Sequence, residues 1–419
     1  MTTATQKIPS GYKQTEIGVI PADWDVKELG KVCKYQNGTS LERYFNQHDG
    51  YKVISIGSYS TSGNYIDNGS YISFDLRDRV NKFILNKDDL TMILNDKTST
   101  GEIIGRVLLI EKSNSYVFNQ RTMRLTPDSD VLPKYLYFLI NSSTVHKKLA
   151  RQAKPGTQIY FNTADILDFK ISFPKDKTEQ STILNALSDA DALVKKLEKL
   201  IEKKKDIKQG AMQELLTGKR RLSGFSKKWE TKRLGDVGEI ITGSTPPTQV
   251  KEYWNGLIPW ITPTDISDKK DIHNSEREIS FSGLQVIRKL PANTLLVTCI
   301  ASIGKNAILR ADGACNQQIN AITPGKDYDV DFLYYLIENS KQYLLGNAGI
   351  TATLMISKKD FSEITFSLPD KPEQVAIATV LSDMDIEIEK LESQLTKYQN
   401  IKQGMMQTLL TGKIRLLTK

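Results

Sequence analysis

The sequence contains few of the residues that build disulfide-linked or metal-bound sites. Its 419 residues include only three cysteines and three histidines: Cys33, Cys299, Cys315, His48, His146 and His273. The cysteines show no CxxC spacing, and no histidine has a second ligand at helical spacing, so neither a disulfide framework nor a zinc site is indicated. We therefore expect that the chain binds no metal.

Long apolar runs are also missing. No stretch approaches the roughly 20 apolar residues of a membrane span, and the polar start MTTATQKIPSGYKQ does not resemble a signal peptide. With 39% hydrophobic and 25% charged residues, the composition is typical of a globular protein of two or three domains. We expect a cytoplasmic protein that does not associate with membranes.

Familiar catalytic signatures are absent as well. There is no Gly-rich loop that opens a helix after a strand, no Walker lysine motif, and no Ser, His and Asp grouping at a known spacing. The Asn/Asp-Pro-Pro-aromatic tetrapeptide of adenine methyltransferases does not occur, since Pro246-Pro247 is followed by Thr248. We therefore expect that the chain is not an enzyme by itself.

What the sequence does contain is a long internal repeat. Residues 179–222 return without a gap 194 positions later as residues 373–416, and 24 of the 44 aligned positions are identical. Such a long period does not fit a solenoid, whose units are far shorter. It indicates two large halves that each end in the same element.

A seven-residue spacing of apolar side chains predicts that this element is a helix with a partner helix. Lys402 interrupts the spacing in the second copy, as Lys204 and Lys208 do in the first. Each copy closes on LLTGK, where Gly218 and Gly412 can take the left-handed conformation that ends a helix. A helix of about 40 residues is roughly 60 Å long, which suits a spacer. The simplest partner for each copy is the other one.

The segments before the two helices are also related. Asn119-Gln120 and the run 135–140 correspond to Asn316-Gln317 and the run 332–337 at a single offset, whereas the stretches between these shared marks have diverged. This pattern suits one scaffold that presents two different recognition surfaces. The net charge of +8 mildly favours a polyanionic partner. The lysines of residues 195–208 fit either the solvated face of a helix or contact with DNA phosphates.

Four segments follow one another in a characteristic order. They are the opening YKQTEIGVIPADWDVKELGKV, the join LLTGKRRLSGFSKKWETKRLGDV, the loop ITGSTPPT, and the paired helices with EQ…LSDxD…IKQG…LLTGK. In these segments, from about Tyr12 to Leu416, the chain resembles the specificity subunit of Type I restriction-modification systems. The resemblance implies two target recognition domains, each reading one half of a split site on double-stranded DNA.

The resemblance also implies partners. Two modification subunits would carry the methyltransferase centre and bind S-adenosylmethionine, and restriction subunits would use ATP and magnesium, so that no cofactor binds this chain. The expected fold class is α+β, with two related α/β-mixed target recognition domains separated by two long antiparallel α-helices in a pseudo-two-fold arrangement. The expected division is 1–174 for the first recognition domain, 175–222 for the first helix, 223–370 for the second domain and 371–419 for the second helix.

The candidate DNA readers are polar side chains on loops around the shared frame, because Arg and Lys can bond guanine, Asn and Gln adenine, and Ser or Thr either. In the first domain they are Asn37, Thr39, Ser40, Arg43, Ser60, Asn64, Lys97, Thr98, Lys154 and Gln158. In the second domain they are Ser244, Thr245, Thr262, Thr264, Ser302, Lys305, Thr351 and Thr353. For any single position an ordinary turn is the alternative.

Residues common to both halves are interpreted as structural, because the halves should read different sequences. Asn119-Gln120, Asn316-Gln317 and the tryptophans Trp24, Trp229 and Trp260 fall in this class. On the helices, four polar positions are not needed for packing and are candidates for docking the modification subunits: Asp189, Gln209, Asp383 and Gln403. Two alternatives stay open: a bifunctional DNA methyltransferase/endonuclease component, and a coiled-coil scaffold without a DNA role.

Overall fold

A computed structural model describes residues 8–96, 101–155, 158–349 and 354–416 of the chain. The chain divides into two compact units. Unit 1 comprises residues 1–198 and 394–419, and unit 2 comprises residues 199–393. Each unit therefore holds one mixed α/β domain together with one part of each of the two long helices.

Unit 1 is built on a central antiparallel sheet in the order β4-β11-β7-β9. Its strands are β4 (Cys33–Asn37), β11 (Thr122–Pro127), β7 (Leu90–Ile93) and β9 (Val107–Leu109). A second sheet has the order β10-β5-β6, in which β10 (Tyr116–Phe118) runs parallel to β5 (Tyr51–Ile54) and β6 (Tyr71–Ile72) pairs antiparallel with β5. A third, two-stranded sheet joins β13 (Lys170–Pro174) to β3 (Trp24–Glu28).

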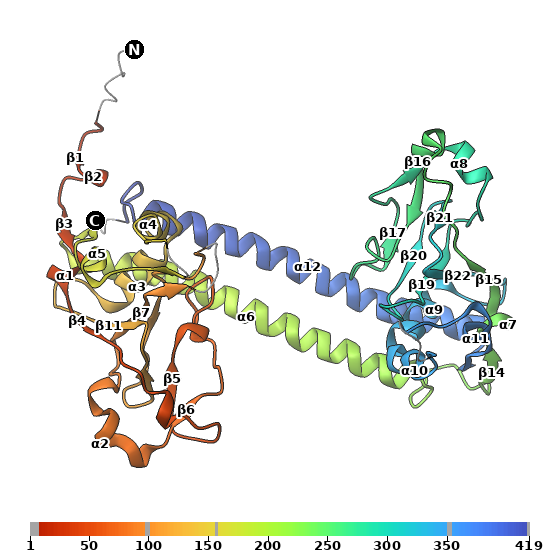
Figure 1. Cartoon of the computed structure of the whole chain (residues 1–419), viewed down its shortest axis with the longest axis horizontal. Coiled ribbons are helices and arrows are strands. Elements are labelled where there is room, and N and C mark those ends of the chain that lie inside the picture. The colour runs from red at the N-terminus through yellow and green to blue at the C-terminus, as the bar shows by residue number, and fades with distance from the viewer. Residues whose placement is uncertain (1–7, 97–100, 156–157, 350–353, 417–419) are drawn as a thin grey trace. The chain divides into compact units, whose positions relative to one another are not determined.

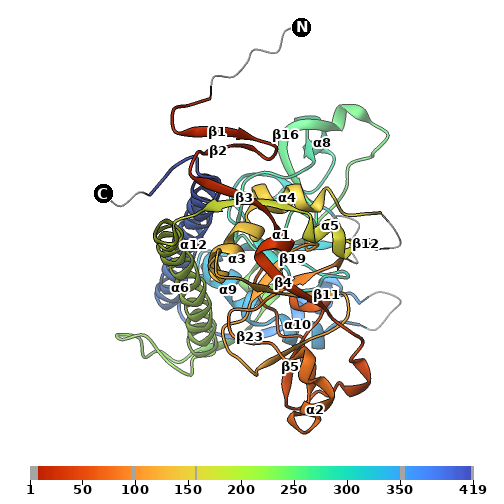
Figure 2. The ribbon, with the colours of Figure 1, turned by 90° about the vertical axis from the view of Figure 1, so that its left-hand side faces the viewer.

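The helices of unit 1 are short and cover these sheets. They are α1 (Leu29–Val32), α2 (Arg77–Val80), α3 (Pro133–Asn141), α4 (Ser143–Ala150) and α5 (Thr163–Leu167). Two further strand pairs belong to unit 1: β1 (Tyr12–Thr15) with β2 (Gly18–Pro21), and β8 (Asn95–Asp96) with β12 (Ile159–Tyr160). The β1–β2 hairpin precedes β3 next to the end of the second long helix, where the Tyr12 hydroxyl donates to the Gly412 carbonyl at 2.8 Å (Figures 1 and 2).

Unit 2 repeats the three main sheets of unit 1, with one additional strand, β17, at the edge of its central sheet. Its central sheet has the order β15-β22-β19-β20-β17, with β15 (Gly238–Thr242), β22 (Ile319–Pro324), β19 (Thr294–Thr298), β20 (Asn306–Leu309) and β17 (Asp271–Ile272). The second sheet is β18 (Glu278–Ile279), β16 (Trp254–Ile261) and β21 (Ala314–Cys315), again with one parallel and one antiparallel pair. The third joins β14 (Glu230–Arg233) to β23 (Thr365–Leu368).

The helices of unit 2 also match those of unit 1. They are α7 (Leu234–Val237), α8 (Phe281–Gln285), α9 (Val330–Asn339), α10 (Lys341–Gly346) and α11 (Lys358–Glu363). The helices α3 and α9 carry the related runs 135–140 and 332–337, and all of these residues except Tyr137 are buried in the core of their unit. The shared frame predicted from the sequence thus consists of the sheets common to both units together with α3 in unit 1 and α9 in unit 2.

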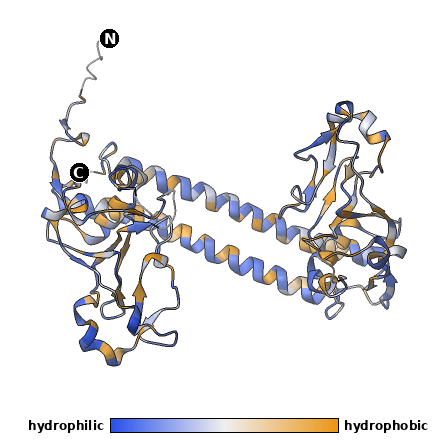
Figure 3. Cartoon of the chain, viewed as in Figure 1, coloured by the Kyte–Doolittle hydropathy of each residue, from blue (hydrophilic) through white to orange (hydrophobic). Residues whose placement is uncertain are grey.

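The two repeats form the long helices α6 (Lys177–Leu215) and α12 (Lys371–Leu409), each of 39 residues. Their heptad side chains are buried or half-buried, with Val194, Leu197, Ile201 and Ile388 among the buried ones. Figure 3 shows apolar residues recurring along otherwise hydrophilic helices. Both Gly218 and Gly412 have a φ of 70°, as predicted for residues that end a helix. In the described part of the chain, no helix combines the length and apolar content needed to cross a membrane.

The lysines that interrupt the heptads form ion pairs between the helices. In unit 2, Lys208 pairs with Asp385 and Lys204 with Glu387. A residue later in α6 therefore contacts a residue earlier in α12. In unit 1, the Nζ of Lys402 lies 2.5 Å from Asp191. The pairing is therefore antiparallel, as predicted, and the polar interruptions are explained by their partners.

The Glu-Gln pair that opens both repeats ties each helix to its own domain. The Gln180 amide donates to the Pro174 carbonyl and its oxygen accepts from the Leu132 backbone N–H, and Gln374 makes the same two bonds with Pro369 and Asp329. Hydrogen bonds of this kind satisfy buried backbone groups that water cannot reach. These residues are shared by both halves because they hold the frame.

The Glu that precedes each glutamine is bound by an arginine from the end of the other helix's repeat. Arg415 donates to Glu179 at 2.6 and 2.7 Å in unit 1, and Arg221 donates to Glu373 at 2.5 and 2.6 Å in unit 2. Both carboxylates are buried, and their bidentate hydrogen bonds to arginine compensate for the free energy cost of desolvation. The segments just after α6 and α12 are fixed in this way.

Candidate DNA-reading surfaces

A short segment with the shared Asn-Gln pair lies where three strands of unit 1 end. We call residues 119–121 the junction of unit 1. The Asn119 N–H donates to the Ile54 carbonyl at the end of β5, and the Arg121 carbonyl accepts from the Leu94 N–H just after β7, both at 2.9 Å. Gly38, just after β4, donates to Thr122 beside the junction at 2.8 Å.

Unit 2 has the same arrangement at residues 316–318, its junction. Asn316 donates to Ile261 at the end of β16, Cys299 donates to Gln318, and Gly243 donates to Ile319, at 2.9, 2.9 and 3.0 Å. The loops that leave these strand ends therefore start from one edge of each domain. Most of the candidate readers follow these strands, so the structure brings their starting points together.

The loop after β4 is organised by a carboxylate that sequence reasoning missed. Glu42 accepts hydrogen bonds from Ser40 at 2.5 Å, Asn119 at 2.9 Å and Gln120 at 2.6 Å. Partial burial by itself raises the pKa of the Glu42 carboxyl, but these hydrogen bonds outweigh it and lower the pKa to about 2. The carboxylate stays ionised and holds the loop against the junction. Its only sequence signal was its position three residues before Phe45 in a polar loop, which is weak.

Other candidates around this loop are exposed and partly engaged. Asn37 ends β4 and donates to the Thr163 hydroxyl at 2.9 Å, and Thr39 is exposed. The guanidinium of Arg43 lies over the Tyr44 ring at 4.6 Å, which leaves its edge free to donate. These side chains present donors and acceptors to solvent at the edge of the domain.

Two candidates near the end of unit 1 also reach this edge. The Gln158 oxygen accepts from Arg121 of the junction at 3.2 Å. Lys154 forms an ion pair with Asp165 at 3.3 Å. By contrast, Ser60 and Asn64 belong to a turn that closes on itself, since the Asn64 N–H donates to the Ser60 hydroxyl at 2.8 Å. That turn is tied to α3, because Tyr137 donates to the carbonyl of Gly63 at 3.2 Å.

In unit 2, the loop after β15 is bound to the junction. The Thr245 hydroxyl donates to the Gln317 side chain at 2.6 Å, and the Ser244 hydroxyl accepts from the Arg288 N–H at 3.0 Å. Two other candidates build a turn: the Thr262 hydroxyl lies 2.7 Å from that of Thr264 and donates to Asp265 at 2.7 Å. The Thr264 side chain is exposed.

The loop after β19 carries the last two described candidates. Ser302 is half-buried and its carbonyl accepts from the Thr298 hydroxyl, which fixes the turn. Lys305 is exposed, so its ammonium is available to a partner. Lys97, Thr98, Thr351 and Thr353 lie outside the described residues.

An arginine stacked on two tryptophans is a feature that the sequence did not reveal. The Arg277 guanidinium lies 4.1 Å from the centre of the Trp254 ring and 5.0 Å from that of Trp260. The rings hold the guanidinium plane while its N–H edge stays exposed, an arrangement suited to bonding a base or a phosphate. No spacing signal could have found it, since it depends on strand pairing between β16 and β18.

The interpretation of shared residues as structural is confirmed in part. Asn119 and Asn316 are buried, as are Trp24 and Trp260, whereas Trp229 is only half-buried. Gln120 and Gln317 are exposed and bond to the loops after β4 and β15. The glutamine of each pair thus belongs to the candidate surface, although its partner belongs to the core.

The four docking candidates on the helices are all exposed. Asp189 and Gln403 flank the Asp191–Lys402 ion pair in unit 1, and Asp383 and Gln209 flank the Asp385–Lys208 pair in unit 2. In each LSDxD motif, one aspartate is therefore used between the helices and the other faces solvent. Each unit thus carries one exposed Asp and one exposed Gln of the candidate set, on different helices.

Among the described residues, no group of His, Cys, Asp and Glu could hold a metal ion. The three thiols are buried, and this burial raises the pKa of Cys33 to about 12 and that of Cys299 to about 11. Such thiols are poor nucleophiles and poor metal ligands.

Comparison with known proteins places these features in a family. The family model described as Type I restriction modification DNA specificity domain matches twice, at residues 21–209 and 226–397. The MjaIX type I restriction enzyme specificity subunit of Methanocaldococcus jannaschii is 36% identical over 174 residues, which is 40% of each chain. The HindI specificity subunit of Haemophilus influenzae is 25% identical over 345 residues, covering 64% of this chain and 74% of that one.

The fold has a counterpart among solved structures. The crystal structure of the Type-I restriction-modification system S subunit from M. genitalium superposes with a TM-score of 0.58 at 15% sequence identity, and the alignment covers the full length of both chains. At this identity the likeness concerns the fold. Two mixed α/β domains and two long helices packed together are common to both.

Proposed function

We propose that this chain, which belongs to the family of Type I restriction modification DNA specificity domains, reads a split site on double-stranded DNA with one unit on each half. It is the DNA specificity subunit of a type I restriction-modification system, and it contributes recognition and no catalysis. The observation that carries the reading mechanism is the pair of junctions. Equivalent backbone bonds hold the two frames, while the loops that leave them differ.

The first residue of each of these loops must be glycine, because it lies too close to the backbone of the junction for a side chain to fit. A Cβ added to Gly38 would lie 1.9 Å from the Asn119 carbonyl oxygen, and one added to Gly243 would lie 2.1 Å from that of Asn316. Only glycine fits this approach of two backbones. The next residues, Thr39-Ser40 in unit 1 and Ser244-Thr245 in unit 2, face no such constraint and are free to specify different bases.

The chemistry of the exposed groups suits base edges. In unit 1, Asn37 and Gln120 offer paired donor and acceptor atoms of the kind that match adenine, and Arg43 offers the two donors that match guanine. In unit 2, Gln317 and Arg277 provide the same two classes. Hydrogen bonds hold Asn37, Gln120 and Gln317 in place before DNA arrives, and aromatic rings hold the two arginines. This pre-arrangement reduces the entropy cost of binding.

The helices provide the second part of the proposal, which is assembly. We place one modification subunit on the surface of Asp189 and Gln403 and a second on that of Asp383 and Gln209. These subunits would bring S-adenosylmethionine, and the restriction subunits ATP and magnesium. Three exposed apolar residues, Leu193, Leu200 and Ile207, recur every seven residues on α6 and offer a partner helix a further contact.

Mapping of modified adenines tests the reading mechanism. The host genome is sequenced for modified bases with the gene present, deleted, and replaced by either Gln120→Ala or Gln317→Ala. We expect deletion to remove methylation from one split motif, and each substitution to relax or weaken one half of it only. An unchanged motif in both variants would count against the junction glutamines as readers, and an unchanged methylome after deletion would count against the function.

Native mass spectrometry tests the assembly. Asp189→Lys with Gln403→Lys should lower the number of bound modification subunits from two to one, and Asp383→Lys with Gln209→Lys should do the same for the other copy. As a matched control, lysine is placed at Glu198, which is exposed on α6 but outside both surfaces. Retention of two subunits by both double variants would refute the docking surfaces.

A further inference from the structure

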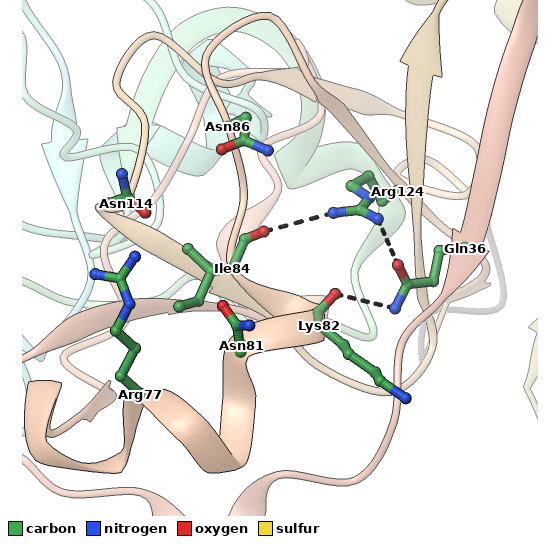
Figure 4. A pocket seen from close by; sticks show the side chains of 8 residues that line it. All are labelled: Gln36, Arg77, Asn81, Lys82, Ile84, Asn86, Asn114 and Arg124. Carbon is green, nitrogen blue, oxygen red and sulfur yellow. Dashed lines mark hydrogen bonds between the residues drawn. The ribbon is translucent and has the colours of Figure 1, made fainter.

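Unit 1 contains a polar hollow of about 500 Å³ that lies on its central sheet (Figure 4). Three cations line it, Arg77, Lys82 and Arg124, together with four side-chain amides, of which Gln36 is one. Of the described residues that line the hollow, none is acidic. A site with three positive charges and no carboxylate favours an anionic ligand.

The floor of the hollow is held in place by hydrogen bonds. The Arg124 guanidinium on β11 donates to the Gln36 oxygen on β4 at 2.5 Å, and Gln36 donates to the Lys82 carbonyl at 3.0 Å (Figure 4). Arg124 also lies 5.7 Å from the centre of the Phe118 ring. The segment that carries Lys82 is therefore tied to the sheet, and the site does not have to form when a ligand binds.

The cations at the mouth are available. Arg77 belongs to α2 and Lys82 to the turn η4 (Asn81–Phe83), and both side chains are exposed. Within the described part of the chain, neither side chain makes an ion pair or a hydrogen bond. The side chains of Asn86 and Asn114 lie on the opposite side of the opening in Figure 4 and offer further donors.

Unit 2 lacks these polar groups at the equivalent place in its sheet. Gln36 is paired with Arg124 in the register of β4 and β11, and the matching pair in β15 and β22 is Ile241 with Ala321. Ala321 is fully buried and Ile241 packs against the same apolar cluster. The polar floor is therefore a property of unit 1, not of the shared frame.

We propose that the hollow holds a phosphodiester group of the DNA beside the half-site that unit 1 reads. This inference rests on the proposed function. Gln36 directly precedes Asn37 at the end of β4, so the hollow lies next to the strand end that carries a candidate reader, although the two side chains leave on opposite faces of the strand. Lysine and arginine bound to phosphates release counterions and fix the register of a protein on the duplex, and such contacts carry no sequence information.

The first test measures how salt affects binding of the full-length chain to random-sequence duplex DNA by fluorescence anisotropy. The variant Arg77→Gln/Lys82→Gln removes both cations at the mouth. The control Arg79→Gln/Lys87→Gln removes two exposed cations that are close in sequence but do not line the hollow. Both variants lose the same charge, so long-range attraction changes equally. Thermal unfolding verifies that all three proteins are folded.

We expect the hollow variant to reduce the slope of log K against log salt by about 1, because the contact to one phosphate is lost, and the control to reduce it by less than half as much. Equal slopes and affinities for the two variants would overturn the inference while leaving the proposed function intact. A wild-type chain that binds no duplex DNA would overturn both.

The second test separates phosphate contact from base reading in the assembled enzyme. In cells, the hollow variant should methylate the same split motif as the wild type, but less completely at all of its sites. A changed base preference in either half-site would show that the hollow reads bases, and the inference of a phosphate site would be wrong. Unchanged motif with unchanged extent of methylation would also refute it.

Discussion

Replacement of the lysine that interrupts the second heptad repeat should destabilise unit 1 by a measurable amount. Lys402 and Asp191 have side chains that are 24% and 21% exposed, so their pair lies between an exposed and a buried one. Exposed pairs contribute about 0–1 kcal/mol, and breaking a buried pair costs about 3–5 kcal/mol. We expect Lys402→Met to cost about 2 kcal/mol, since Asp191 keeps a second partner in Lys195 at 3.0 Å.

Replacement of both partners should be far less costly than replacement of Lys402 alone. Asp191→Leu/Lys402→Met should cost less than about 1 kcal/mol or be stabilising, because the one charge that loses its partner, that of Lys195, is 56% exposed and the contact between the helices becomes more apolar. Urea unfolding followed by circular dichroism at 222 nm measures each variant, and a double-mutant cycle gives the coupling. Additive effects of the two single substitutions would refute the ion pair as a contributor.

Two matched lysines on α6 sharpen the interpretation. Lys205→Met breaks the pair with Glu392, whose side chains are 57% and 45% exposed, and should cost less than about 0.5 kcal/mol. Lys208→Met in unit 2 should cost less than Lys402→Met, because Asp385 still accepts from the Tyr335 hydroxyl at 2.6 Å. If the exposed pair proved as important as the half-buried ones, burial would not be the controlling variable.

Burial lowers the pKa of His146 from its ordinary 6.5 to about 4. The free energy of unfolding of unit 1 should therefore fall by about 3 kcal/mol as the pH falls through this window. His146→Gln should flatten this loss in urea titrations at several pH values. Gly218→Ala should lower the free energy of unfolding by about 1 kcal/mol, because the φ of this residue is 70° and its added Cβ would lie 3.5 Å from the Trp229 indole. Gly412→Ala should cost more in the same assay, because its added Cβ would lie only 2.5 Å from the Pro21 ring. The helices are also expected to set the length of the DNA spacer between the half-sites. One heptad added between Leu197 and Lys204, with a matching heptad in α12, should lengthen the methylated motif by roughly three base pairs at 3.4 Å each without changing its half-sites. An unchanged spacer in a folded, assembled variant would refute this role.

Sequence reasoning was most successful where a periodic signal reports a physical constraint. The heptads of the two repeats predicted the helical pair, and the LLTGK endings predicted the left-handed glycines, because apolar spacing and backbone conformation are local properties. The lysines at positions 204, 208 and 402 appeared only as interruptions. Their partners lie on the other helix, so an explanation required knowledge of the antiparallel register.

The candidate surfaces could be predicted only as loops. The spacing of the shared marks located the frame, and the diverged polar stretches between them located the loops after β4 and β15. The hollow of unit 1 could not be predicted, because Gln36 and Arg124 are separated by 88 positions and meet only through strand pairing. The role of Glu42 is hidden for the same reason, since its main partners are 77 and 78 positions away.

The junctions explain how one frame can carry two different surfaces. Their bonds to the strand ends are made by backbone groups of Asn119, Arg121, Asn316 and Gln318, which do not depend on the side chains of the loops. A substitution at the exposed Thr39 therefore leaves the strand ends paired and the core packed. Exposed loop substitutions far from core and caps usually change stability by less than about 0.5 kcal/mol. Because recognition is carried by side chains whose replacement costs little stability, each unit can acquire a new half-site without rebuilding its domain.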